Sequence, residues 1–135
     1  MSEQSIQKKI YSVIKDRHSN AAVEISVLNR CIDIAYFNNE EELVTIEVKL
    51  KDWRKAIEQA LDHQLYADKS YICLPKPQRN VSENLLSILK ESGIGLIWFE
   101  IETKKRIVVE EFVEAKKNDF CWAQARRKVE SMIYA

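Results

Sequence analysis

The sequence predicts an α/β fold: a central mixed β-sheet that starts with an antiparallel hairpin, continues with parallel strands, and is flanked by helices. Three observations support it. Apolar residues recur at helical spacing near the amino terminus, short β-branched segments follow, and strands alternate with helices over residues 43–100. That alternation favours right-handed crossovers and parallel pairing. The 135 residues fit one domain over 1–135, because about 100–150 residues is the commonest domain size.

The first half of the chain is expected to hold one helix and three strands. Isoleucines 6, 10 and 14 recur at helical spacing, which predicts a helix over residues 4–17 that ends before the turn-prone pair Ser19 and Asn20. The three strands are predicted at about residues 23–28, 31–37 and 43–50. Asn29 and Arg30 are expected to form the two-residue turn of the first hairpin.

The second half is expected to alternate helices and strands. A helix is predicted over residues 52–67, with an apolar stripe formed by Trp53, Ile57, Ala60, Leu61 and Leu65. Asn80 and Glu83 have the spacing of a capping pair for the next helix, and Gly93 suits its left-handed end. The remaining elements are the strands KSYICLP, GLIWFEI and RIVVEEFV and a final helix over residues 119–133.

Composition and charge exclude several classes of protein. Lysine and arginine total 21, as do aspartate and glutamate, so the formal charge is zero. This excludes a protein held to nucleic acid mainly by a large net positive field, but it leaves room for a local basic groove. No stretch approaches the ~18 uninterrupted apolar residues of a spanning helix. The three cysteines show no metal-finger spacing. We therefore expect a cytoplasmic protein without a membrane partner.

Strand alternation brings three charged residues together. Glu47 and Lys49 point to the same face of the third strand, separated by roughly 7 Å. In the second strand, Ile32, Ile34 and Tyr36 are expected to share one face and Asp33 the other. Pairing of the two strands can then place Asp33 beside Glu47 and Lys49.

Two readings of this trio remain open. It can be a structural salt bridge of Lys49 with either carboxylate on a half-exposed sheet. Alternatively, the two carboxylates and the Val48 backbone carbonyl can supply part of the oxygen shell of Mg²⁺. Such an ion activates a water and polarises a phosphodiester, while Lys49 stabilises the developing charge.

These residues also resemble a known family. Asp33, a hairpin, IEVKL, then a helix and a short strand are similar to the PD-(D/E)XK nuclease superfamily, which has the restriction-endonuclease-like fold. Asp33, Glu47 and Lys49 match its D…E-x-K signature, and the resemblance covers about residues 4–100, leaving 101–135 as a carboxy-terminal addition. The sequence departs from the pattern at two positions. Ile32 replaces the frequent proline, and His63 replaces the more usual tyrosine four residues after Gln59.

The resemblance implies a DNA endonuclease of repair, recombination or defence that works as a homodimer with Mg²⁺, which Mn²⁺ can replace. Gln59 is then a fourth catalytic residue, and Glu24 an additional metal ligand or a solvent-facing edge residue. The alternative is a catalytically inactive nuclease-fold module that binds nucleic acid or another protein. RNA remains open as the substrate, although DNA is favoured.

Basic residues supply the expected contacts to nucleic acid. The first group directly follows the signature and comprises Lys51, Arg54 and Lys55, with His63 further along the same helix. Two further groups lie toward the carboxy terminus: Lys104, Lys105 and Arg106, and then Lys116, Lys117, Arg126, Arg127 and Lys128. Each group can equally be solvated surface, because charged residues are common on exposed faces.

Overall fold

The computed structural model describes residues 2–103 and 106–135. Four helices and six strands are found in this part of the chain. In order they are α1 (Glu3–Arg17), β1 (Ala21–Val27), β2 (Arg30–Phe37), β3 (Leu43–Val48), α2 (Trp53–His63), β4 (Lys69–Pro75), α3 (Glu83–Ser92), β5 (Gly95–Ile101), β6 (Ile107–Val113) and α4 (Ala123–Ile133).

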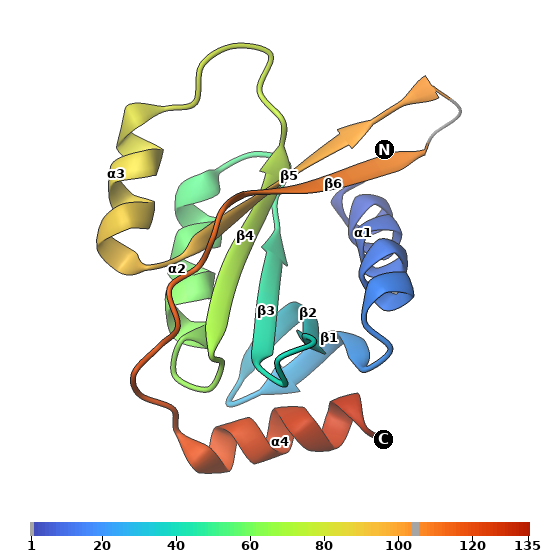
Figure 1. The fold of residues 1–135 in the computed structure, drawn as a ribbon, viewed down its shortest axis with the longest axis vertical. Coiled ribbons are helices and arrows are strands. Elements are labelled where there is room, and N and C mark those ends of the chain that lie inside the picture. Colours follow the sequence, from blue (N-terminus) through green and yellow to red (C-terminus); the bar gives the residue numbers. More distant parts are fainter. Residues whose placement is uncertain (1, 104–105) are drawn as a thin grey trace.

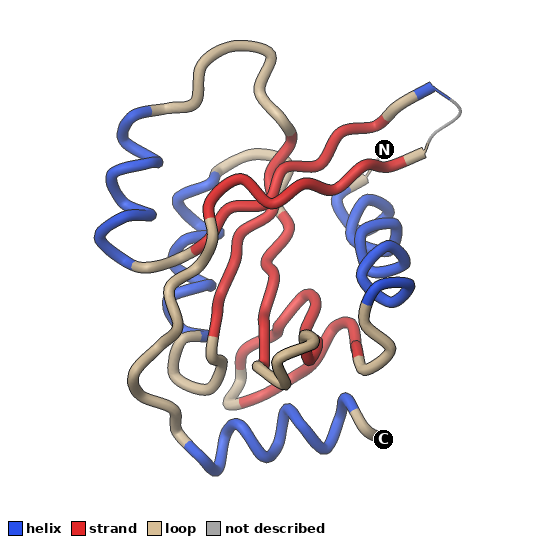
Figure 2. Tube along the Cα trace, in the orientation of Figure 1, coloured by secondary structure: helices blue, strands red, loops and turns tan. Residues whose placement is uncertain are grey.

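The six strands form one mixed sheet in sequence order (Figure 1). β1, β2 and β3 pair antiparallel, β3, β4 and β5 pair parallel, and β6 returns antiparallel to β5. The predicted mixed sheet, with a hairpin start and parallel strands behind it, is therefore confirmed. The two central connections each contain a helix, as a parallel crossover requires. Figure 2 shows how the β1–β2 hairpin turns away from the plane of β3 and β4.

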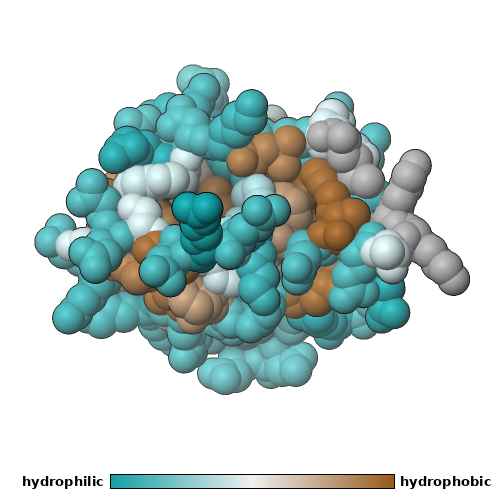
Figure 3. Space-filling view, turned by 90° about the horizontal axis from the view of Figure 1, so that it is seen from above, coloured by the Kyte–Doolittle hydropathy of each residue, from teal (hydrophilic) through white to brown (hydrophobic). Residues whose placement is uncertain are grey.

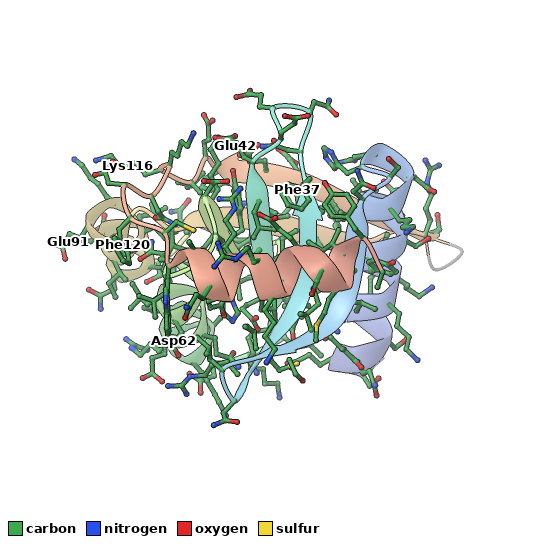
Figure 4. The ribbon with its side chains drawn as sticks, turned by 90° about the horizontal axis from the view of Figure 1, so that it is seen from below. Phe37, Glu42, Asp62, Glu91, Lys116 and Phe120 are labelled. Carbon is green, nitrogen blue, oxygen red and sulfur yellow. The ribbon has the colours of Figure 1, made fainter. Side chains whose placement is uncertain are left out.

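Helices cover both faces of the sheet. α1 packs its isoleucines against β2 and β3 and also contacts β6, whereas α2 and α3 pack on the opposite face against β4 and β5 (Figure 1). α4 lies across the β1–β2 hairpin (Figure 4), where the Tyr134 ring, just after the helix, stacks on Phe37 at 5.3 Å between centroids. The central strands β3, β4 and β5 are thus buried between helices, which explains their nearly continuous apolar sequences.

β2 changes the face that it presents to the core at Asp33. Residues two apart in a regular strand share a face. Ile34 and Tyr36 do pack with α1, but Ile32 packs in the separate cluster under α4. The prediction that all three share one face is therefore wrong for Ile32. Next to this position, Glu24 of β1 has a left-handed φ of 52°, which rotates the paired strands relative to regular alternation.

The hairpin turn lies one residue earlier than predicted. Leu28 and Asn29 both have positive φ, 51° and 59°, which is the backbone of the two-residue turns that match strand twist. Arg30 already belongs to β2 and pairs with Val27. Asparagine adopts a positive φ easily, but leucine does so rarely. The sequence therefore predicted the turn at Asn29 and Arg30, one residue too late.

Three helix boundaries also differ from the sequence prediction. α2 ends at His63, and Leu61 and Leu65 are exposed. Its buried face keeps the predicted Ile57 and Ala60 and adds Ala56 and His63. The next helix, α3, is capped by Ser82, whose hydroxyl accepts from the Leu85 N–H, so the predicted Asn80 cap is wrong. The final helix begins at Ala123, later than predicted, whereas Gly93 ends α3 with a φ of 78° as expected.

Gly95 at the start of β5 is a position where a side chain does not fit. A Cβ there would collide with the Tyr71 ring and lie 2.7 Å from the Ala115 nitrogen. The ring is held in place, since its hydroxyl donates to Glu111 at 2.6 Å and accepts from the Ala115 N–H at 3.2 Å. We expect Gly95→Ala to lower the free energy of unfolding by about 1–3 kcal/mol in urea denaturation. Ser87→Ala, on the exposed side of α3, should change it little.

Within the described residues, the helices are too short or too polar to cross a membrane.

Candidate functional site

Asp33 and Glu47 are neighbours at the point where β2 and β3 separate. Backbone pairing of these strands ends at Ile34 and Ile46. Beyond it, side chains replace the ladder: the Asp33 N–H donates to Glu47 Oε1 at 3.2 Å, and the Val48 N–H donates to Asp33 Oδ2 at 2.9 Å. Each carboxyl group therefore binds the strand that carries the other. The convergence of the two acids expected from the hairpin is present.

Burial changes the protonation of this pair. Glu47 is 0 % exposed, and burial followed by the neighbouring Asp33 charge raises its pKa to about 9. Burial also raises the pKa of Asp33, although the Val48 N–H and the Lys49 charge partly oppose that rise. At neutral pH the pair therefore holds a proton on Glu47. Removing that proton leaves two adjacent negative charges, one buried and one half-buried, which is unfavourable unless a cation joins them.

Lys49 forms its ion pair with α1. Its Nζ lies 3.4 Å from Glu3 Oε1, and the other carboxylate oxygen of Glu3 accepts from the Leu50 N–H at 3.2 Å. In the described part of the chain no ion pair joins Lys49 to Asp33 or Glu47, so the simple salt bridge considered from the sequence is not found. The ammonium is mostly buried and lies at the carboxyl end of β3, next to the acid pair.

The inner face of α2 covers Glu47. His63 is 1 % exposed, and its Nδ1 lies 3.3 Å from Glu47 Oε1 without the alignment of a hydrogen bond. Burial lowers the pKa of His63 to about 4, so the ring is neutral at pH 7. The expected contact of His63 with nucleic acid is therefore wrong, because the residue is enclosed. One turn earlier, Gln59 has a buried Oε1 with no hydrogen-bond partner among the described residues.

The acid pair has donor atoms for a cation. Glu47 Oε2 is buried and finds no hydrogen-bond partner in the described part of the chain. Carboxylate and carbonyl oxygens are the ligands of hard cations such as Mg²⁺, which also keeps several waters. No three histidine, cysteine or acidic side chains among the described residues converge on one point. A cation here would thus be held by Asp33, Glu47 and backbone or water oxygens. The sequence predicted the same two carboxylates, with the Val48 carbonyl as the backbone oxygen.

The basic residues after β3 lie at the surface. Lys51, Arg54 and Lys55 are all exposed, and the Arg54 guanidinium lies 4.4 Å from the centre of the Trp53 ring. These basic residues follow Lys49 in the chain and are accessible to a polyanion. This accessibility is what the prediction of nucleic-acid contacts requires.

Other predicted residues have different surroundings. Glu24 is exposed on β1, and its carboxylate accepts from Gln4 at 3.4 Å. Arg126 is held by Asp68 and Glu130, each at 2.9 Å, which makes it a structural cation. Lys104 and Lys105 lie outside the described residues.

Sequence reasoning missed the contribution of α1. Glu3 binds Lys49, and Gln7, one turn later, is buried with its Nε2 3.5 Å from the Asp33 carbonyl. Glu3 reads as an ordinary acid in the first turn of a helix capped by Ser2. The sequence did contain one signal for this contribution. Glu3 and Gln7 are polar, lie one helical turn apart, and flank Ile6, the first isoleucine of the apolar face.

The fold and the site define an α/β protein with a six-stranded mixed sheet flanked by helices and a pair of adjacent acids, one of them buried, at a strand end. The chain is similar to the solved structure of SPO1766, a protein of unknown function from Silicibacter pomeroyi, with a TM-score of 0.66 and 10 % identity over 99 % of this chain and 86 % of that one. This likeness concerns the fold. A second match is SfsA of Pyrococcus furiosus in complex with Ca²⁺, with a TM-score of 0.45 and 14 % identity over 82 % of this chain and 62 % of that one.

Comparison with models of protein families and with curated proteins finds no match.

Proposed function

We propose that this chain is a Mg²⁺-dependent nuclease with a restriction-endonuclease-like core, which hydrolyses phosphodiester bonds in DNA. The observation that carries the proposal is the pair formed by the half-buried Asp33 and the buried Glu47, with an unpartnered oxygen and a raised pKa on Glu47. Perturbed carboxyl groups of this kind are typical of functional sites. The match of Asp33, Glu47 and Lys49 to the nuclease signature, within a helix, hairpin, strand, helix, strand order, supports the same class.

Each residue then has a definite task. Asp33 and Glu47 would hold the cation, and Glu47 would lose its proton on binding it. When bound, Mg²⁺ polarises the phosphoryl group and lowers the pKa of a coordinated water. Lys49 stabilises the negative charge that develops on the phosphate, and Glu3 orients the ammonium while that charge is absent. Gln59 has an unused acceptor and serves as a positioning residue on the inner face of α2.

Metal binding can be tested without any substrate. Mg²⁺ or Mn²⁺ at millimolar concentration should raise the melting temperature by a few degrees at pH 8, because a cation that binds only the folded state stabilises it by mass action. Asp33→Asn should abolish this increase while retaining an acceptor for the Val48 N–H. Asp119→Asn, an exposed substitution far along the chain, should behave like the wild type. Equal shifts for both variants would show that the acid pair is not the metal site.

Cleavage is the direct test of function. Purified protein is incubated with linear duplex DNA, single-stranded DNA and RNA in Mg²⁺, in Mn²⁺ and in a chelator. The expected result is metal-dependent cleavage of DNA. A chain that neither cleaves any of these substrates nor binds the metal would belong to the alternative class, an inactive nuclease-fold module.

A further inference from the structure

A groove opens at the carboxyl ends of the parallel strands, next to Lys49. It is lined by residues that follow β3, by the end of β4 with the loop after it, and by β5. Its volume is about 320 Å³, which is within the range of pockets that hold small organic groups. Carboxyl ends of parallel strands are the usual position of ligand sites in α/β folds. Seen from above, this end of the molecule shows apolar residues among hydrophilic ones (Figure 3).

The walls of the groove suit a flat aromatic ring. Trp53 is half-buried at the first position of α2, with the Arg54 guanidinium over one face of its ring, and the buried Trp98 of β5 also lines the groove. Leu74 and Pro75 complete the apolar lining from the end of β4. Stacking on aromatic side chains is how proteins bind unpaired nucleobases without regard to sequence.

The rim of the groove suits an anion. Two lysines and one acid line it, Lys51, Lys76 and Asp52, and all three are exposed. The first turn of α2 also faces this end: its cap residue Asp52 has a φ of 54° and makes no capping hydrogen bond through its side chain. Backbone N–H groups at such a terminus, together with the helix dipole, favour phosphate. An occupant with an aromatic ring and a phosphate matches both halves of the groove.

We propose that this groove binds an unstacked base and the adjacent phosphate of single-stranded nucleic acid. The groove adjoins the candidate site along the chain, since its lining residues Leu50 and Lys51 follow Lys49 directly. This inference names the substrate class of the proposed nuclease. It rests on the proposed function, because only a nuclease would cut the strand that the groove binds. A base within a duplex cannot enter the groove, because its faces are covered by neighbouring bases. The substrate is therefore single-stranded, or has an unpaired end or branch near the cleaved bond.

Binding without cleavage tests the groove. The affinity of a fluorescein-labelled oligothymidylate is measured by anisotropy in a chelator, next to a hairpin duplex of equal length. We expect the single strand to bind more tightly and Trp53→Ala to weaken its binding about 5- to 150-fold, since stacking of one base contributes ~1–3 kcal/mol. Trp53→Phe should retain most of the affinity. Trp122→Ala, an exposed tryptophan outside the groove, is the matched control.

An oligonucleotide with an abasic site separates stacking from other effects. Wild type should lose affinity when the base in the groove is missing, and Trp53→Ala should lose little more, because the two changes remove one contact. Lys76→Ala should weaken the binding of every strand and reduce the magnitude of the salt dependence by about 1. Two results would overturn the groove assignment even if the protein cleaves DNA. One is an unchanged affinity in Trp53→Ala, and the other is an equal loss of affinity for the abasic strand in the wild type and in Trp53→Ala. Binding as expected without cleavage in Mg²⁺ would instead overturn the nuclease and leave the groove.

Discussion

Lys49→Met should reduce Mg²⁺-dependent cleavage by at least about 100-fold, the usual cost of losing one group that stabilises transition-state charge. The change keeps an unbranched apolar stem and removes only the ammonium. The folded state should lose less than about 1 kcal/mol, since the lysine forms a single ion pair at 3.4 Å with a half-exposed glutamate. A large loss of activity with little loss of stability is expected only if the ammonium takes part in the reaction.

The measurement compares initial rates of cleavage with the urea midpoint of the same preparations. Lys8→Met on the exposed side of α1 is the matched control, and both of its values should equal those of the wild type. Cleavage that persists in Lys49→Met would show that the reaction occurs elsewhere or comes from a contaminant. Retained metal binding in this variant is also expected, because Lys49 is not among the predicted ligands.

The sequence contained the information for the sheet and the acid pair because both depend on local patterns. LVTIEV has no competing helical period, and GLIWFEI and KSYICLP were predicted with the bounds that the structure shows. The neighbourhood of Asp33 and Glu47 follows from the pairing of two strands joined by a short loop. The assignment of a reaction to that pair is a different kind of inference, and it stays a prediction.

The missing parts depend on contacts between distant segments. Glu3 meets Lys49 across 46 positions of the chain, and no local pattern distinguishes it from a surface acid. The change of face at Ile32 depends on the left-handed φ of Glu24, which a glutamate adopts rarely enough to be unpredictable. His63 was predicted to contact nucleic acid, but it is buried beside Glu47 of the sheet. Tertiary packing overrode the pattern at each of these positions.

Glu47→Gln should stabilise the protein without metal, and the gain should grow with pH. The pKa of Glu47 is raised in the folded state, so its contribution to stability is fully present below the unfolded pKa of about 4.5 and is lost as the pH rises toward 9. Glutamine keeps the acceptor for the Asp33 N–H and carries no ionisable group. The variant should therefore equal the wild type near pH 4.5 and exceed it by several kcal/mol, in order of magnitude, near pH 9.

His63 makes the shape of the two pH profiles distinctive. Its pKa is lowered in the folded state, so its contribution is fully present above about 6.5 and is lost as the pH falls toward 4. Between pH 4.5 and 6.5 the effects of Glu47 and His63 oppose each other, and wild-type stability from this pair should be nearly flat. It should then fall from pH 6.5 to 9 by about 3 kcal/mol, since one proton per molecule is worth ~1.4 kcal/mol per pH unit. The variant should rise to pH 6.5 and stay level above it.

Urea unfolding at intervals of half a pH unit, in a chelator, measures both profiles. Glu42→Gln is the matched control, because the hydrogen bond from Asn38 and the nearby Lys69 lower the pKa of Glu42 and its removal should destabilise the protein at neutral pH. A Glu47→Gln variant that is also less stable at pH 8 would mean that the carboxylate is ionised and compensated in the folded state. The opposite sign for two buried glutamates in the same protein identifies Glu47 as the one whose charge lacks a partner, which is the condition that a bound cation would satisfy.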